Sequence, residues 1–206
     1  MGIYENQVLP RAINVMLGTK GFGRVVRGPA CAGLRGDVIE LGFGSGLNLP
    51  HLPPEVTGVW TVDPSVVGMQ LARKRISASS VPVHEGGLDG ARLDFPDDRF
   101  DGALSTMTLC TIPDAQGALR ELRRVLKPGA EFHFAEHGLA PDPKVARFQH
   151  RFDPWQQRFA GGCHLARDVR SLIGDAGFEI DQLDTRFIQG PKAWSYMYIG
   201  RAQNPA

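Results

Sequence analysis

The sequence has few cysteines, no long apolar run and almost no excess of charge. Its three cysteines, Cys31, Cys110 and Cys163, stand far apart and form no C-x-x-C pair. This spacing argues against a disulfide framework and against a zinc site, and it favours a reducing compartment. No apolar stretch approaches the length of a membrane span, and the N-terminus lacks the features of a signal peptide. We therefore expect a cytoplasmic protein.

Length and composition favour a single domain over residues 1–206. A chain of 206 residues of which 42% are hydrophobic can bury a full core. The formal net charge is +1, so electrostatics gives no argument for a nucleic-acid partner. We expect a small-molecule substrate, and the sequence does not indicate an oligomeric state.

The strongest functional signal is a glycine-rich turn between two β-rich runs. The first run ends on Glu40-Leu41, and the second, from Val59 to Val62, is followed by Asp63. Glycine lets the chain turn sharply and lets a ligand touch the backbone, because no Cβ stands in the way. An acidic residue at the end of the second strand can accept both hydroxyls of a ribose. The pattern predicts a nucleoside-binding βαβ unit, whose turn contains Gly42, Gly44 and Gly46.

The glycine spacing separates two kinds of nucleoside site. Dinucleotide-binding turns have the pattern G-x-G-x-x-G, whereas this turn reads G-x-G-x-G and has Leu47 at the place of the third glycine. Glu40 would also repel a nearby phosphate, but it suits the cationic end of a ligand. The sequence has no Tyr-x-x-x-Lys pair, which counts further against a nicotinamide-dependent oxidoreductase.

Strands and helices alternate along the chain, which predicts an α/β fold with a mostly parallel sheet and helices on both faces. Ligands then lie over the carboxyl ends of the strands, where the strand order reverses. We expect strands at 37–41, 58–63, 81–84, 100–106, 131–136, 178–187 and 193–201. Helices are expected within 1–35, from 47 to the prolines at 53–54, and at 66–77, 114–126 and 168–176, with a long polar connection at 137–163.

Two further segments accompany the glycine turn. Phe95 to Asp101 reads FPDDRFD, and Leu119 to Ala130 reads LRELRRVLKPGA. Together with the E-x-G-x-G-x-G turn, they resemble the class I S-adenosylmethionine-dependent methyltransferases of the type 11 group, which includes the ubiquinone and menaquinone C-methyltransferases. The resemblance implies a Rossmann-like sheet of seven strands that ends in an antiparallel pair, and S-adenosylmethionine as the cofactor.

The C-terminal third resembles a narrower group. Ala135-Glu136-His137, Asp153-Pro154-Trp155, Gly162 to Asp168 and Tyr198-Ile199-Gly200 are similar to segments of the methyltransferase-like thiol S-methyltransferases and their small bacterial relatives. The comparable mammalian stretch reads GCNLTRE, so Cys163 and Arg167 match while His164 departs. The resemblance implies methyl transfer to a thiol sulfur or sulfide, with a quinol or phenol carbon or oxygen as the alternative acceptor. A cofactor-binding protein without catalysis is a more distant alternative.

The resemblance also assigns cofactor contacts. The acid before the turn and the first glycines should hold the methionine amino group, and Asp63 the ribose hydroxyls. Pro64 or Ser65 and the Gly87-Leu88-Asp89 triplet would contact the adenine, although Asp89 could equally be a turn residue. Tyr4 and the helical segment 1–35 would form a lid that excludes water. The predicted cofactor-binding residues are Tyr4, Glu40, Gly42, Gly44, Gly46, Asp63, Pro64, Gly87, Leu88, Asp89, Thr106 and Met107, the last two beside the methionine moiety.

The acceptor is expected in the insertion after the fifth strand, at 137–165. His137 is the candidate for accepting or steering the substrate proton, with His164 and Asp153 behind it, and a structural pairing of His137 with Glu136 is the alternative. No cluster with metal-ligand spacing is evident, so we expect metal-independent transfer. Aromatic residues recur at helical spacing, which usually indicates core, but their place in this insertion favours an apolar substrate wall: Phe148, Phe152, Trp155 and Phe159.

Overall fold

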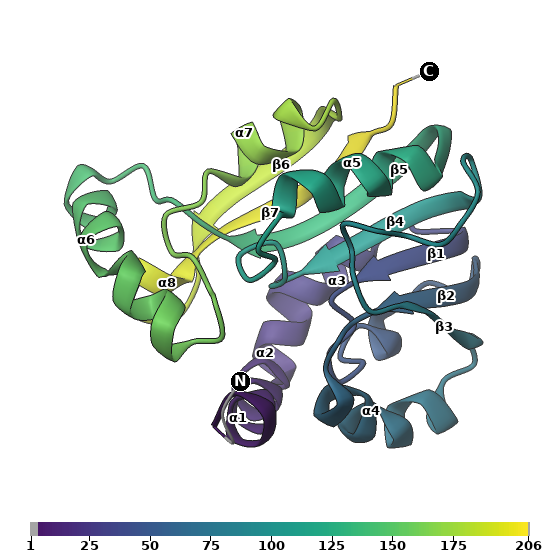
Figure 1. The fold of residues 1–206 in the computed structure, drawn as a ribbon, viewed down its shortest axis with the longest axis horizontal. Helices are drawn as coiled ribbons and strands as arrows, with labels where there is room; N and C mark the ends of the chain where they lie inside the picture. Colours follow the sequence, from purple (N-terminus) through teal and green to yellow (C-terminus); the bar gives the residue numbers. More distant parts are fainter. Residues whose placement is uncertain (1–3, 206) are drawn as a thin grey trace.

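A computed structural model describes residues 4–205. Seven strands form one sheet in the order β3-β2-β1-β4-β5-β7-β6 (Figure 1). The first five strands are parallel, whereas β7 runs antiparallel to both of its neighbours, β5 and β6. The predicted Rossmann-like sheet with an antiparallel C-terminal pair is therefore confirmed.

The strands are β1 (Gly36–Leu41), β2 (Val56–Val62), β3 (Val83–Gly87), β4 (Phe100–Thr106), β5 (Leu126–His137), β6 (Glu179–Phe187) and β7 (Tyr196–Gln203). The helices and helical turns before β1 are η1 (Tyr4–Val8), α1 (Leu9–Leu17), α2 (Lys20–Phe22), η2 (Gly23–Arg27) and α3 (Gly28–Cys31). Those after it are η3 (Leu49–His51), α4 (Val66–Ala78), α5 (Ala115–Val125), α6 (Pro143–Phe159), α7 (Val169–Asp175) and α8 (Lys192–Ser195). Within residues 4–205, no helix is both long and apolar enough to cross a membrane.

The structure differs most from the predicted elements in two segments. The helix expected from residue 47 is only the single turn η3, because the glycine turn extends to Gly46 and Pro53 follows Leu52, which leaves too few residues for a longer helix. The polar connection expected at 137–163 contains the 17-residue helix α6. Asp142 starts that helix by accepting hydrogen bonds from the backbone N–H groups of Lys144 and Val145.

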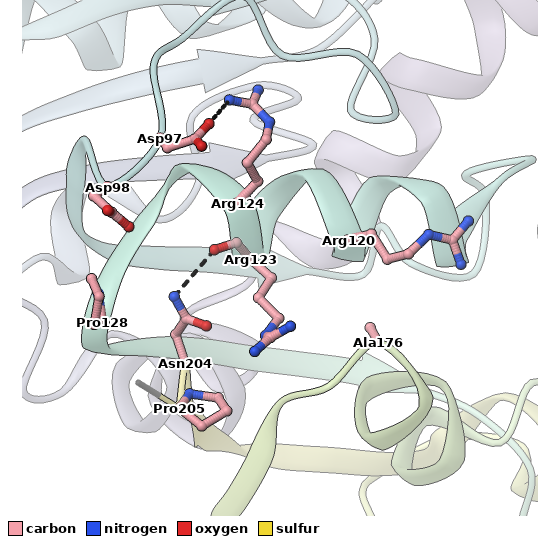
Figure 2. Close-up of a pocket in the computed structure, with 9 residues that line it drawn as sticks. All are labelled: Asp97, Asp98, Arg120, Arg123, Arg124, Pro128, Ala176, Asn204 and Pro205. Atoms are coloured by element: carbon pink, nitrogen blue, oxygen red, sulfur yellow. Dashed lines mark hydrogen bonds and ion pairs between the residues drawn. The ribbon is translucent and has the colours of Figure 1, made fainter.

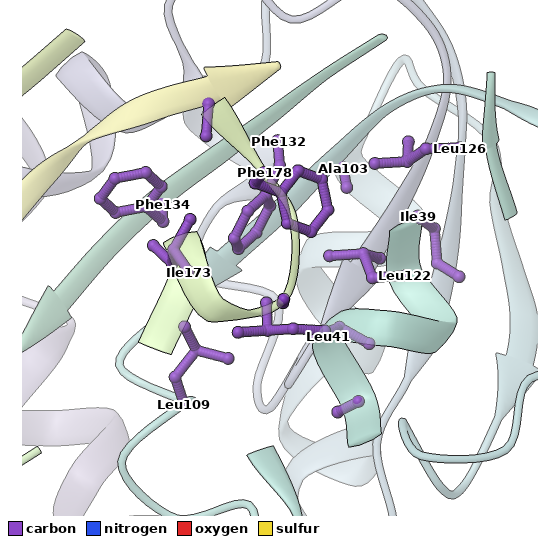
Figure 3. Close-up of a cluster of buried hydrophobic side chains, with 14 of the residues drawn as sticks. Ile39, Leu41, Ala103, Leu109, Leu122, Leu126, Phe132, Phe134, Ile173 and Phe178 are labelled. Carbon is purple, nitrogen blue, oxygen red and sulfur yellow. The ribbon is translucent and has the colours of Figure 1, made fainter. Parts of the chain in front are cut away.

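Helices cover both faces of the sheet and create two cores (Figure 1). On one face, α5 and α7 pack against β5 with Leu122, Ile173 and Phe132 fully buried (Figure 3). On the other face, residues of η2 and α3 such as Val26 pack against Val38. Each fully buried Leu, Ile or Phe side chain contributes about 1.5–3 kcal/mol relative to an exposed one. The rigid sheet between these cores fixes the positions of its strand ends.

The carboxyl ends of β1, β4 and β5 meet at one edge of the sheet. Leu41 of β1 pairs with Ser105 of β4, and Thr106 of β4 pairs with Ala135 of β5. The strand order reverses between β1 and β4, and such a reversal is where open α/β sheets bind ligands. The glycine turn after β1, the loop after β4 and His137 at the end of β5 therefore lie at the expected ligand edge.

A surface depression lies at the opposite edge of the sheet, beside the start of β5 (Figure 2). Asn204 projects into this region and its side-chain amide donates to the carbonyls of Arg123 (3.1 Å), Leu126 (2.9 Å) and Lys127 (3.3 Å). Arg124 nearby forms an ion pair with Asp97. The contacts of Asn204 connect the C-terminal end of α5 to the segment that follows β7, so we interpret this depression as structural.

Replacing Asn204 by Ala is expected to lower the free energy of unfolding by about 1–3 kcal/mol, because buried carbonyls lose their donor. Urea unfolding followed by circular dichroism measures the change. The neighbouring Gln203 is exposed, so Gln203→Ala serves as the control and should change stability by less than about 0.5 kcal/mol. Equal losses in the two variants would contradict the role assigned to the Asn204 amide.

Candidate active site

The glycine turn after β1 has a backbone that other residues rarely adopt. Gly42, Gly44 and Gly46 have φ angles of +73°, +55° and +71°, in the left-handed region that favours glycine. A Cβ at Gly42 would overlap with the side chain of Thr108, whereas no described atom lies within 4 Å of the Cβ position at Gly44. Gly42 is therefore required for packing, and Gly44 leaves open space in which a ligand can approach the backbone.

Asp63, which follows β2, holds this turn in place. Its Oδ2 accepts a hydrogen bond from the backbone N–H of Gly44 at 2.7 Å, and its Oδ1 accepts one from Ser65 at 2.7 Å. Burial raises the pKa of Asp63, and these two bonds oppose the shift. A carboxylate can accept about four hydrogen bonds, so both oxygens keep capacity for the hydroxyls of a ribose.

Glu40, in β1, belongs to a buried polar network. The amide of Asn48 donates to Glu40 Oε1 at 2.8 Å and to Thr106 Oγ1 at 2.9 Å. Arg27 donates to Asn48 Oδ1 at 2.7 Å and to Thr106 Oγ1 at 2.9 Å. Neither Arg27 nor Asn48 lies in a recognisable motif, so the sequence alone does not predict this network. Thr106 turns its hydroxyl into this network, where it supports Glu40.

The second oxygen of Glu40 is available for a ligand. Glu40 is 1% exposed, and its Oε2 has no hydrogen-bond partner among residues 4–205. Burial raises the pKa of Glu40 to about 8, although Asn48 and Arg27 act in the opposite direction. Leaving a buried carboxylate oxygen unpaired is costly, and a cationic amino group would remove that cost. The site therefore fits the charged methionine end of S-adenosylmethionine.

The loop after β4 is fixed by the buried residue Glu136. Its carboxylate accepts hydrogen bonds from Ser105 Oγ (2.7 Å) and from the backbone N–H groups of Thr108 (2.9 Å) and Leu109 (3.1 Å). Met107, between them, has a φ angle of +57°, which is unfavourable for a side chain of its kind. The described hydrogen bonds of Glu136 all go to this loop or to Ser105, and none joins it to His137.

His137 instead contacts a cysteine. Its Nε2 lies 3.2 Å from Sγ of Cys163, and Cys110 completes a group whose three ligand atoms lie within 4.8 Å of one another. The Cys110 thiol, and then His137, lower the pKa of Cys163. Burial lowers the pKa of His137, but the contact with Cys163 leaves it above the ordinary value. The sequence does not predict this group, because its three members are distant in the chain and form no recognisable metal-ligand spacing.

His164 and Asp153 lie beside this group and shape the loop that carries Cys163. His164 Nδ1 lies 3.2 Å from Oδ2 of Asp153, and Oδ1 of Asp153 accepts hydrogen bonds from the backbone N–H groups of Leu165 and Ala166. Burial raises the pKa of Asp153, but its hydrogen bonds, first that from Gln157, outweigh burial and lower it. We therefore interpret these two residues as positioning Cys163.

The predicted adenine side is open to solvent. Gly87, with a φ angle of +137°, accepts a hydrogen bond from the backbone N–H of Asp63 at 3.1 Å. Pro64 and Asp89 are exposed, and Leu88 is 72% exposed. Asp89 Oδ1 accepts from the N–H of Ala91 at 2.9 Å, which is the turn role that the sequence left open. An adenine contact by these residues remains a prediction.

The N-terminal segment and α6 expose apolar side chains. Tyr4, in η1, is 49% exposed, and residues 1–3 of the predicted lid lie outside the described residues. On α6, Phe148 and Phe152 stack at 5.5 Å, and the edge of Trp194 meets both rings. The four aromatics of α6 are between 37% and 58% exposed. Their helical spacing therefore does not indicate core here, and the exposure is compatible with a substrate wall.

Comparison with known proteins identifies the family. A methyltransferase domain model matches residues 39–134. Over 154 residues, the chain is 31% identical to a phosphatidylethanolamine N-methyltransferase of Cereibacter sphaeroides, covering 68% of this chain and 75% of that protein. A Thermotoga maritima S-adenosylmethionine-dependent methyltransferase has the same fold, with a TM-score of 0.68, 22% identity and 98% coverage of both chains. The chain belongs to the class I S-adenosylmethionine-dependent methyltransferases of the type 11 group, and S-adenosylmethionine is the cosubstrate of this family.

The relatives act on different acceptors. The chain is 30% identical over 167 residues to the rat thiol S-methyltransferase TMT1B, covering 79% of this chain and 66% of that protein. It is 35% identical over 149 residues to a 2-phytyl-1,4-naphtoquinone methyltransferase of Synechococcus elongatus, covering 69% of this chain and 63% of that protein. The chain thus spans slightly less than two thirds of the length of both relatives. Their names alone do not decide the acceptor.

Alanine substitutions in the glycine turn should separate packing from binding. Gly42→Ala is expected to lower stability by about 2–5 kcal/mol, because backbone strain of about 1–2 kcal/mol adds to overpacking against Thr108. Gly44→Ala should lower stability by only about 1–2 kcal/mol through strain, yet weaken cofactor binding by filling the open space. Thermal unfolding and calorimetric titration with S-adenosylmethionine measure the two effects.

Gly129 provides the control for that experiment. It also has a positive φ angle, +76°, and no described atom lies within 4 Å of its Cβ position, but it lies at the opposite edge of the sheet. Gly129→Ala should therefore match the stability loss of Gly44→Ala and leave cofactor affinity unchanged. Unchanged cofactor affinity in Gly44→Ala would contradict a ligand close to that residue.

Proposed function

We propose that the protein transfers a methyl group from S-adenosylmethionine to the sulfur of a small thiol or of sulfide. The observation that carries this proposal is the group of Cys110, His137 and Cys163 at the carboxyl edge of the sheet. The similarity to thiol S-methyltransferases supports the same acceptor. The three free cysteines fit a reducing compartment, so we infer that the enzyme acts in the cytoplasm.

In this proposal, the residues around the glycine turn hold the cofactor. Glu40 Oε2 accepts from the methionine amino group, and the open space at Gly44 brings the ligand close to the backbone. Asp63 accepts from the ribose hydroxyls, while Pro64 and the segment 87–89 lie against the adenine. The cofactor supplies an electrophilic methyl group on its sulfonium, so the protein contributes mainly alignment and the exclusion of water.

The acceptor sulfur loses its proton at the group around His137. A few per cent of an ordinary thiol is already ionised near pH 7, so only modest help is needed. His137 and Cys163, which are in contact, are the groups that can accept this proton, because Glu136 already accepts hydrogen bonds from Ser105 and Thr108. The exposed aromatics of α6 form an apolar wall for the rest of the acceptor, and Tyr4 with the N-terminal helices covers the site.

A quinol or phenol acceptor is the second candidate. The aromatic side chains exposed on α6 and at Trp194 could stack on a flat ring, and one relative methylates a naphthoquinone. A quinol carbon or a phenol oxygen is less easily deprotonated than a thiol, and its methylation would depend more strongly on a positioned base.

Release of S-adenosylhomocysteine over alkyl thiols, aryl thiols, sulfide, phenols and quinols tests the acceptor. We expect turnover with thiols, and His137→Ala should lower the rate at saturating cofactor by at least about tenfold without weakening cofactor binding. The exposed His150 provides the control, since His150→Ala should retain the rate. Turnover with phenols or quinols alone would replace the thiol assignment, and a His137→Ala rate within about twofold of the wild type would exclude His137 from the reaction.

The pH dependence of cofactor binding tests the role of Glu40. Burial raises the pKa of Glu40 to about 8, and its carboxyl group must be ionised to bind an amino cation. Cofactor affinity should therefore fall as the pH is lowered from 8 to 6, by up to about tenfold per pH unit. Calorimetry in buffers of different ionisation enthalpy should also detect the released proton.

Glu40→Gln should bind the cofactor more weakly at pH 8 and lose this pH dependence. The exposed Glu55 provides the matched control, and Glu55→Gln should keep both the affinity and its pH dependence. An identical pH profile in Glu40→Gln and the wild type would show that another group is responsible.

A further inference from the structure

Cys110, His137 and Cys163 form a buried group with the composition of a metal site. Their exposed fractions are 4%, 5% and 9%, and their two Sγ atoms and one ring nitrogen lie within 4.8 Å of one another. Zinc binds sulfur at about 2.3 Å and imidazole nitrogen at about 2.0–2.1 Å in tetrahedral sites. Two such ligands are then about 3.5–3.8 Å apart, close to the 3.2 Å between His137 Nε2 and Cys163 Sγ.

We propose that Cys110, His137 and Cys163 bind one zinc ion and leave its fourth coordination position open to a ligand. Two thiolates and one neutral imidazole are the ligand set of zinc sites that keep an open position for catalysis. Thiolate ligands also favour zinc over magnesium and calcium, which prefer oxygen. The distances between the three residues along the chain explain why no zinc pattern is visible in the sequence.

The charge of the surroundings suits this ion. Two thiolates neutralise the two charges of zinc, so the complex adds no net charge to a buried site, where an unpaired charge is costly. The nearby carboxylate of Glu136 is satisfied by the loop after β4. Arg167 lies close to both cysteines and donates a hydrogen bond to the carbonyl of Leu109. The two charged side chains beside the site, Glu136 and Arg167, are therefore opposite in sign.

Each ligand is held by a different part of the fold. The carbonyl of Cys110 accepts a hydrogen bond from the N–H of His164 at 2.8 Å. His137 ends β5, where it pairs with Met197 of β7. Cys163 lies in the loop that Asp153 of α6 holds through Leu165 and Ala166. Three elements thus hold the donor atoms together before any ion binds, which lowers the cost of forming the site.

The role of the ion rests on the proposed thiol methylation. A thiol that binds at the fourth position loses its proton to solvent as the S–H bond is replaced by a bond between sulfur and zinc. The sulfur then attacks the methyl carbon, and the bond between that carbon and the sulfonium sulfur breaks to give a thioether and S-adenosylhomocysteine. In this form of the reaction, His137 acts as a zinc ligand, and the metal lowers the pKa of the thiol.

Metal binding can be measured without any activity assay. The reduced full-length protein, dialysed against Zn²⁺ and then against buffer, should retain one zinc ion per chain by elemental analysis. Cys110→Ser and Cys163→Ser should each weaken zinc binding by at least about 100-fold. Cys31 lies in a separate core cluster, so Cys31→Ala should retain the ion. Retention of zinc by both serine variants, or loss in Cys31→Ala, would overturn the site.

Cobalt provides a second test that needs no variant and therefore does not depend on the folding of the serine variants. Co²⁺ bound by two thiolates in a tetrahedral site should give the intense visible bands and the thiolate charge-transfer band typical of such complexes, and added Zn²⁺ should abolish them. Absence of these bands, together with binding of less than about 0.1 zinc per chain, would overturn the proposal, because a site of this type holds one ion.

The acceptor panel separates this proposal from the proposed function. Thiol methylation at the same rate by zinc-free and zinc-loaded protein would overturn the role of the ion and leave thiol methylation standing. Stoichiometric zinc with no turnover on any thiol would support the metal site and overturn the thiol assignment. A rate that rises in proportion to bound zinc, with cofactor affinity unchanged, would support both.

Discussion

The candidate site has two parts, the glycine turn and the group of Cys110, His137 and Cys163, and both depend on the buried carboxylate of Glu136. Glu136 is fully buried, and its oxygens hold the loop after β4 through Ser105, Thr108 and Leu109. Removing a carboxylate from water costs several kcal/mol unless hydrogen bonds replace the lost hydration, and here three donors do so. Because Thr108 packs beside Gly42 and Cys110 follows Leu109, the same loop positions both the glycine turn and Cys110.

The glycine turn and its acidic neighbours were largely predictable from the sequence, because their signals are local. The glycines, Glu40 and Asp63 lie within one βαβ unit, and the strand ends that position them follow from runs of apolar residues. The network around Glu40 was not predictable, since Arg27 and Asn48 meet Thr106 only after η2, the turn after β1 and β4 have assembled. Tertiary contacts of this kind leave no spacing pattern in the chain.

The surroundings of His137 and of α6 were predicted less well, for two physical reasons. The place of His137 at a strand end identified it as a candidate. One alternative paired it with the adjacent Glu136, but neighbouring residues in a strand point to opposite faces. His137 instead contacts Cys163, which lies in the loop after α6. The aromatic residues of α6 recur at helical spacing, which marks a shared face but does not say whether that face is covered.

The burial of Cys110, His137 and Cys163 restricts how a substrate would reach this proposed acceptor group. Cys163 follows Gly161 and Gly162, whose φ angles are +61° and +84°, so the loop that carries Cys163 begins with a backbone that only glycine adopts readily. A Cβ at Gly161 would meet the side chain of Leu9, and every residue of α1 remains at least partly exposed. Cys163, the least buried of the three residues, therefore follows a turn that lies against Leu9 of α1. If an acceptor binds at this group as proposed, displacement of this turn and α1 would open a path to Cys163, while the sheet and the loop held by Glu136 would stay in place.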